Sequence, residues 1–181
     1  MNRLACLLPF FLAGCGAAGD HPVGTDVPAS NSGLVTGERI VNADAEPGNW
    51  LSTGRTYDEQ RFSPLTDIND GNVGGLGLAW YFDIDTNRAM EATPLVHDGV
   101  MYVSVPWSIV YALNAATGEL IWTFDPKTPR SWGAYACCDV PNRGVALWND
   151  KVYVATLDGY LVTFGMGDAT PAVASLMSTT T

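Results

Sequence analysis

The sequence predicts an all-β protein, and three observations lead to that fold class. The 19 Gly and 11 Pro are spread along the 181 residues rather than repeated at a fixed period, which is typical of many turns. Apolar and polar side chains alternate, most clearly in Val100–Val105 and Lys151–Thr156, as in half-buried strands. Asp98-Gly99 and Asp158-Gly159 favour tight hairpin turns because glycine accepts positive φ. A run of β-hairpins is therefore expected.

Eight strands are expected between the turn signals. Each is a short run rich in β-branched, aromatic or other large apolar side chains. The expected strands are Leu78–Ile84, Ala92–Val96, Val100–Val105, Ile109–Leu113, Glu119–Asp125, Arg143–Trp148, Lys151–Thr156 and Tyr160–Phe164.

Composition and charge exclude several classes of protein. Apolar residues make up 47% of the chain, which is enough for one core at this length, and charged residues only 15%. A wholly disordered chain is therefore excluded. The 19 acidic and 9 basic residues give a net charge of -10. Such a surface repels a phosphate backbone, so no nucleic-acid partner is expected.

The first residues resemble a lipoprotein signal peptide. Arg3 precedes an apolar run from Leu4 to Gly14, shorter than the roughly 20 residues that span a bilayer. Leu12-Ala13-Gly14-Cys15 resembles the lipobox in which a cysteine carries a diacylglycerol. We expect residues 1–14 to be a signal peptide and the protein to be periplasmic, anchored to a membrane by a lipid on Cys15. The alternative is an ordinary cleavage site with Cys15 incidental.

Residues 15–48 are expected to form a flexible tether. They are mostly small, polar or proline residues and contain too few large apolar ones to offset the entropy of ordering. One or two helical turns are expected between Glu38 and Glu46. The chain has only two histidines, His21 in the tether and His97 beside a turn, so a histidine-based zinc or catalytic site is not expected.

Internal repetition predicts the architecture. Trp80 and Trp122 close similar segments 42 residues apart, and a four-stranded propeller blade takes roughly 40–50 residues. A second alignment, at an offset of 51, carries Ser108–Leu113 onto Gly159–Phe164. About two blades of a β-propeller are therefore expected within residues 49–164. The alternative is a β-sandwich in which the tryptophan spacing arises by chance.

The repeat is expected to stop at Phe164. At the offset of 51 the counterpart of Trp122 is Val173. Pro171 would also remove a hydrogen bond from the expected strand. Residues 165–181 are therefore interpreted as an aberrant, disordered tail, of the kind left by a frameshift or premature stop.

Several segments carry a family resemblance. They are Gly48–Tyr57, Arg61–Leu65, Glu91–Val96, Ala112–Trp122 and Cys137–Gly144. These segments are similar to the amino-terminal region of the quinoprotein alcohol dehydrogenases, periplasmic PQQ-dependent enzymes related to methanol and ethanol dehydrogenases. The resemblance runs from about residue 38 to 164. It implies an eight-bladed propeller, of which this chain holds about a quarter, and a structural role for Trp122 between blades.

The adjacent Cys137 and Cys138 are the most specific motif. An exported protein meets an oxidising compartment, and neighbouring Cα atoms lie ~3.8 Å apart, closer than in most disulfides, so a bridge would form a strained ring. The alternatives are two unbridged small residues or a cysteine that pairs between chains. The resemblance implies that the bridged pair forms a flat floor against one face of PQQ.

Arg143 and Glu91 complete the predicted cofactor site. A guanidinium can hold a carboxylate of the tricarboxylate PQQ by two parallel hydrogen bonds. A carboxylate beside an anionic cofactor is repelled unless it is protonated or compensated by a cation. The resemblance implies that both Glu91 and Arg143 contact PQQ. The alternatives are a surface ion pair for Arg143 and a solvated acid for Glu91.

The resemblance implies oxidation of primary alcohols to aldehydes, with electrons passing to PQQ and then to a periplasmic acceptor. It places the calcium ligands and the catalytic base in later blades, beyond this chain. No residue here is assigned a catalytic or metal-binding role, and the fragment is expected to be inactive alone. The alternative is a non-catalytic propeller lipoprotein that scaffolds outer-membrane assembly. A scaffold has no reason to place Glu91, Arg143 and two cysteines together.

Overall fold

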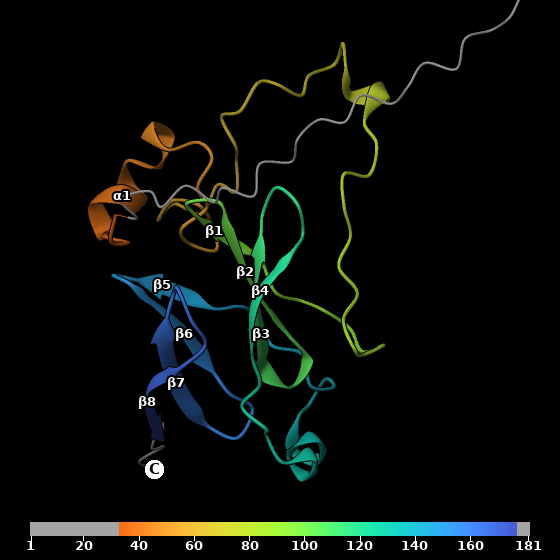
Figure 1. Cartoon of the computed structure of the whole chain (residues 1–181), viewed down its shortest axis with the longest axis vertical. Coiled ribbons are helices and arrows are strands. Elements are labelled where there is room, and N and C mark those ends of the chain that lie inside the picture. Colours follow the sequence, from red (N-terminus) through yellow and green to blue (C-terminus); the bar gives the residue numbers. More distant parts are fainter. Residues whose placement is uncertain (1–32, 177–181) are drawn as a thin grey trace, which may run out of the picture.

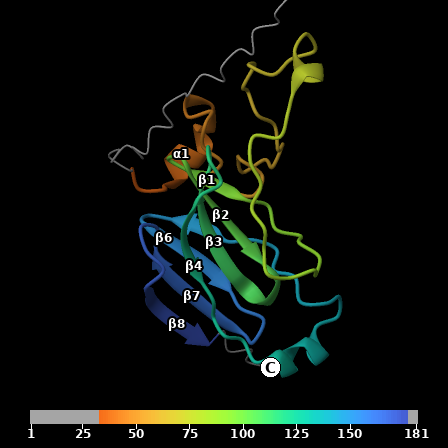
Figure 2. The same cartoon turned by 45° about the vertical axis from the view of Figure 1, so that its right-hand side comes forward.

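The computed structural model describes residues 33–176, which form two four-stranded antiparallel sheets. Neighbours in each sheet are consecutive in sequence, in the orders β1-β2-β3-β4 and β5-β6-β7-β8. The two sheets lie side by side in both ribbon views (Figures 1 and 2). The prediction of an all-β fold with two four-stranded units is confirmed.

Most expected strands form, with ends shifted by at most three residues. The strands are β1 (Leu95–His97), β2 (Val100–Val105), β3 (Ile109–Asn114), β4 (Leu120–Phe124), β5 (Ala146–Trp148), β6 (Lys151–Ala155), β7 (Tyr160–Gly165) and β8 (Pro171–Leu176). The helical segments are α1 (Gly37–Val41) and the 3₁₀ turns η1 (Ala43–Ala45), η2 (Val73–Gly75), η3 (Pro106–Ser108) and η4 (Arg130–Tyr135).

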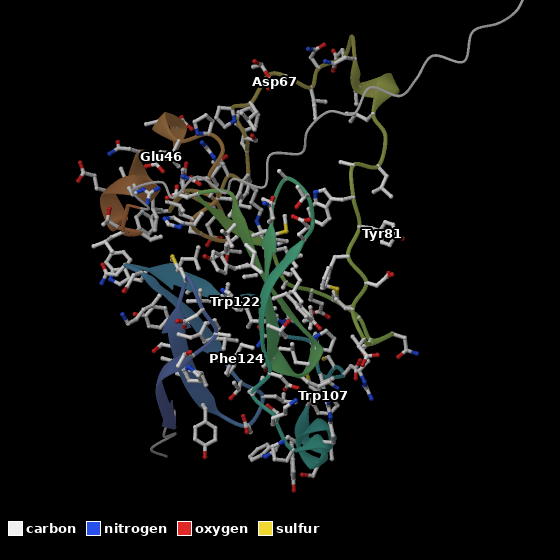
Figure 3. All side chains as sticks on the ribbon, viewed as in Figure 1. Glu46, Asp67, Tyr81, Trp107, Trp122 and Phe124 are labelled. Carbon is white, nitrogen blue, oxygen red and sulfur yellow. The ribbon has the colours of Figure 1, made fainter. Side chains whose placement is uncertain are left out.

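The core lies between the two sheets. It is formed by facing side chains of β1 to β4 and of β5, β6 and β7, together with Val35, Ile40 and Leu51 from the amino-terminal segment. Phe164 is fully buried, and its ring centroid lies 5.2 Å from that of Trp122 and 4.8 Å from that of Phe124. Figure 3 shows Trp122 and Phe124 in the middle of the molecule, where the sheets meet.

Trp122 joins the two sheets, as predicted. Its Nε1 donates a hydrogen bond to the carbonyl oxygen of Met166 at 3.0 Å, in the turn after β7. Trp80, which precedes the first sheet, makes the equivalent hydrogen bond. Its Nε1 donates to the carbonyl oxygen of Ala115, in the turn after β3, at 3.2 Å. Ala115 and Met166 are 51 residues apart, so the repeat continues beyond Phe164.

The prediction of a disordered tail from residue 165 is wrong for the part that the structure describes. Gly165 completes β7, and Pro171–Leu176 form β8, which pairs with β7. Pro171 is tolerated because it is the first residue of β8, which pairs with no strand other than β7 among the described residues. Residues 177–181 lie outside the described residues.

The strand expected at Leu78–Ile84 has no partner among residues 33–176. The segment contains no sheet residue, and Leu78 and Tyr81 are 81% and 73% exposed. A run of large apolar side chains favours a strand, but a strand also needs a hydrogen-bonded neighbour, and this segment has none in the described part of the chain.

The prediction of a flexible tether is wrong from residue 33 onward. Val35 is fully buried and pairs with Asn149 of the β5–β6 turn, and Ile40 is 5% exposed. The expected helical turns are present as α1 and η1. A few apolar residues at the right spacing therefore dock this segment on the sheets. Residues 1–32, with the predicted signal peptide and Cys15, lie outside the described residues.

A charged network, which the sequence did not reveal, also holds this segment. The Arg39 guanidinium bonds both carboxylate oxygens of Glu46, with Nε to Oε1 at 2.8 Å, and donates to the carbonyl oxygen of Gly33 at 2.6 Å. Buried His97 lies 2.9 Å from the same carbonyl oxygen. His97 therefore helps to hold the amino-terminal segment on the first sheet.

We expect this network to make the protein less stable in acid. The hydrogen bond from Arg39 holds the pKa of Glu46 below its usual value, against a smaller opposing effect of burial. The stabilisation is therefore present above the unfolded pKa of about 4.3 and is lost as pH falls through the lower folded value.

Urea unfolding of the wild type and Glu46→Gln at pH 6 and pH 3 measures this effect. The variant should be less stable by about 1 kcal/mol at most at pH 6, and the difference should shrink at pH 3. Glu38→Gln, an exposed acid of α1, is the control. An equal difference between wild type and Glu46→Gln at both pH values would contradict the prediction.

Candidate functional site

The two adjacent cysteines lie on the long connection between β4 and β5, just after η4. Their Sγ atoms are 2.6 Å apart, and both side chains are exposed free thiols in the structure. Asp139 follows them with a φ of 71, and its backbone forms an isolated β-bridge with that of Cys137. The chain therefore turns sharply at the pair and presents both sulfur atoms outward. A disulfide between them stays a prediction.

Arg143 and Glu91 form an ion pair although they lie on the segments that lead into different sheets. Glu91 lies ahead of β1 and Arg143 ahead of β5, and Arg143 Nη2 is 3.2 Å from Glu91 Oε2. The Arg143 side chain is 79% exposed and that of Glu91 is 37% exposed. The ion pair thus keeps most of the guanidinium open to solvent.

Asn142 anchors the backbone beside Arg143, a role that the sequence did not reveal. Its Nδ2 donates to the carbonyl oxygen of Ala155 at 2.8 Å and to Ser108 Oγ at 3.2 Å. Its Oδ1 accepts from the Gly144 N–H at 3.1 Å. Gly144 has a φ of 138, which disfavours other residues. The side chain of Asn142 therefore ties the Arg143 turn to both sheets.

The charges of Arg143 and Glu91 act on the cysteine pair. The pKa of the Cys138 thiol is raised, first by its hydrogen bond with Cys137 and then by the charge of that neighbour. A smaller raising effect comes from Glu91, and Arg143 opposes it. The four side chains predicted for the site thus share one electrostatic neighbourhood.

A groove opens beside Arg143. It has a volume of about 570 Å³ and is lined by the Arg143 turn and by side chains of β6, β7 and the turn between them, including Tyr153, Leu157 and Leu161. Small-molecule sites in proteins commonly measure about 300–1,000 Å³. The groove is therefore large enough for part of a planar organic ligand.

The described residues, 33–176, contain neither a metal-binding cluster nor a membrane-spanning helix. No set of three or more His, Cys, Asp or Glu side chains is arranged there to hold a metal ion. Nor does that part of the chain contain a helix with the length and apolarity needed to cross a membrane.

A match to a protein-family model decides the assignment. Residues 50–170 match the β-propeller domain of the PQQ family described as glucose, ethanol and alcohol dehydrogenases. The chain belongs to this family. The match spans strands β1 to β7 and includes the four predicted site residues, so the family resemblance seen in the sequence is confirmed.

Individual proteins with similar sequences are also dehydrogenases by name. The quinohemoprotein alcohol dehydrogenase ADH-IIG of Pseudomonas putida is 57% identical over 144 residues, which are 80% of this chain and 20% of the relative. A 1-butanol dehydrogenase (cytochrome c) of Thauera butanivorans is 50% identical over 118 residues, 65% of this chain and 17% of the relative. The chain thus spans about a fifth of the length of these curated relatives.

A solved structure of the family supports the architecture. The structure of ADHIIG from Pseudomonas putida HK5 matches with a TM-score of 0.79 at 53% identity, covering 85% of this chain and 22% of that one. The two sheets are therefore part of a β-propeller of the PQQ family. The relatives are named as dehydrogenases, which supports the dehydrogenase interpretation over the scaffold.

Proposed function

We propose that the chain forms part of the PQQ site of a PQQ-dependent alcohol dehydrogenase. The observation that carries the proposal is the Arg143–Glu91 ion pair in the electrostatic neighbourhood of the exposed Cys137 and Cys138. The sequence predicts this role for each of the four residues, and the charges of Glu91 and Arg143 both act on the Cys138 thiol.

The chemistry of this donor set fits PQQ. The cofactor is planar and carries three carboxylates, so it needs a cation on a chain with a net charge of -10. The open guanidinium of Arg143 supplies that cation in a form that can bind a carboxylate through two hydrogen bonds. Glu91 is compensated by the same guanidinium, which removes the objection that its charge would repel the cofactor.

The cysteine pair fits the flat face of the cofactor. Two adjacent outward sulfur atoms offer a polarizable, weakly hydrated surface with no charge when bridged. Bridging them releases two protons and two electrons, which a disulfide-forming oxidant of the periplasm accepts. The bridged pair would shield one face of the cofactor from water.

In the complete enzyme, PQQ supplies the two-electron acceptor for oxidation of a primary alcohol to an aldehyde. The residues of this chain bind and orient: Arg143 holds a carboxylate, Glu91 fixes Arg143, and the sulfur pair covers one face. We assign the base that takes the hydroxyl proton, the calcium ligands and the contact with an electron acceptor to polypeptide beyond these residues. Substrate and acceptor therefore belong to the complete protein.

Titration of the chain with PQQ tests the proposal. Binding should quench tryptophan fluorescence and saturate with one PQQ for each chain. Reduction of the protein followed by alkylation of Cys137 and Cys138 should weaken binding at least tenfold, because two bulky groups then cover the sulfur surface. The oxidised protein treated with the alkylating reagent, but without reductant, is the control. Equal binding by alkylated and control protein would contradict the proposal.

A further inference from the structure

Trp107 occupies an unusual backbone position at the turn between β2 and β3. Its φ is 67 and that of Ser108 is 60, in the left-handed region that bulky residues rarely adopt. Such a conformation costs about 1–3 kcal/mol and persists where surrounding contacts enforce it. The Trp107 N–H donates to the carbonyl oxygen of Val140 at 3.0 Å. The turn is thereby fixed against the loop that carries the cysteines.

Two arginines flank the indole of Trp107. The guanidinium carbon of Arg130 lies 4.1 Å from the ring centroid, and that of Arg88 lies 5.5 Å from it. Both distances are within the ~6 Å over which a cation is attracted to an aromatic ring. Arg88 also forms an ion pair with Asp139, the residue directly after Cys138. Figure 3 shows Trp107 near the helical turn η4, which begins at Arg130.

These contacts hold the cysteine loop on both sides. Arg130 and Gly133 precede the pair, and Asp139 and Val140 follow it. A Cβ on Gly133 would come within 3.0 Å of the Trp107 ring, so the absence of a side chain lets the loop approach the indole. Trp107 thus contacts the loop ahead of the cysteines with its ring and is tied to the loop behind them through its backbone N–H.

Val140 is buried, at 2% exposed, but the described residues from Arg130 to Asp139 are exposed or only partly buried. None of the residues of η4 is buried, and both cysteines and Asp139 are exposed. A cavity of about 460 Å³ lies between the loop and Trp107, lined by Arg88, Arg130, Asp139 and their neighbours. A loop with so little buried surface is free to move unless particular contacts restrain it.

We propose that Trp107, Arg88 and Arg130 form a clamp that positions Cys137 and Cys138. The clamp selects the sharp turn in which both sulfur atoms face outward together. It therefore favours the disulfide between Cys137 and Cys138 over the two free thiols. The role of this preference in PQQ binding rests on the proposed function. All three are positioning residues, because they act on the cofactor surface through the loop.

The test measures the equilibrium between dithiol and disulfide in glutathione buffers. One glutathione disulfide oxidises the pair, and two glutathione molecules are released as the Cys137–Cys138 bond forms. After acid quenching and alkylation, mass spectrometry of the tryptic peptide 131–143 counts blocked thiols. This peptide contains no other cysteine, so Cys6 and Cys15 do not interfere.

Arg88→Gln and Trp107→Leu should each shift the equilibrium at least fivefold toward the dithiol, and Arg88→Lys should recover part of the shift. Lys127→Gln and Trp132→Leu are matched controls, since Lys127 is 82% exposed and the Trp132 ring contacts Tyr135 rather than the clamp. Both controls should match the wild type. Arg88 is 45% exposed, so its variant is not expected to unfold.

The proposal is overturned if Arg88→Gln and Trp107→Leu match the wild type, or if the controls shift equally. This measurement needs no PQQ. A shift in the clamp variants of a chain that fails to bind PQQ would therefore refute the proposed function alone. PQQ binding with an unshifted equilibrium would refute the clamp alone.

Discussion

Replacing Phe164 by alanine is expected to lower the free energy of unfolding by about 3–5 kcal/mol, since this is the usual cost of deleting a fully buried aromatic ring. Phe164 is 0% exposed and contacts the rings of Trp122 and Phe124 across the interface between the sheets. The substitution would leave a cavity at the point where both sheets meet. Few other single changes should destabilise the protein as much.

Urea unfolding followed by tryptophan fluorescence measures this loss. Tyr160→Ala is the matched control, because it removes another aromatic ring from β7, but one that is 37% exposed. The control should lose much less than Phe164→Ala. Equal losses in the two variants would contradict the view that Phe164 is central to the packing of one sheet on the other.

Arg143→Gln is expected to weaken PQQ binding at least tenfold, the second large effect. The substitution removes the cation that we propose for a cofactor carboxylate and leaves Glu91 without its partner. The remaining carboxylate would then repel the anionic ligand. Because the guanidinium is exposed, the substitution should change stability little.

Fluorescence titration with PQQ gives the affinity of each variant. Lys151→Gln removes a charge of the same sign from β6, where the 38% exposed side chain pairs with Asp150, and should bind as the wild type does. The effect of Arg143→Gln should also be smaller at high salt, which screens exposed charges. An unchanged affinity in Arg143→Gln would remove this residue from the site.

The hairpins could be predicted because their signals are local. Alternation and Asp-Gly turns predict the hairpins β1–β2 and β6–β7 without knowledge of distant contacts. Two errors came from signals that depend on position in a sheet. Pro171 predicts a broken strand, yet the first residue of a strand with one partner tolerates proline. Leu78–Ile84 has the pattern of a strand, but pattern alone does not supply a partner.

In the candidate site, too, residues with a local sequence signal could be predicted, and residues that act through distant contacts could not. Glu91, Cys137, Cys138 and Arg143 could be found because each belongs to a short motif with a chemical meaning. The residues that hold these motifs in place, Trp107, Arg88 and Asn142, act through contacts with distant parts of the chain. The only local signal for Trp107 was a large aromatic residue in a short connection after Pro106.

A crystal structure of the oxidised chain with PQQ is the most direct test of the central claim, that four side chains from two motifs form one cofactor surface. We predict planar density against the Sγ atoms of Cys137 and Cys138, with a carboxylate within hydrogen-bond distance of Arg143. Glu91 should remain paired with that guanidinium. Ordered PQQ bound elsewhere, with Cys137, Cys138 and Arg143 not in contact with it, would contradict the account.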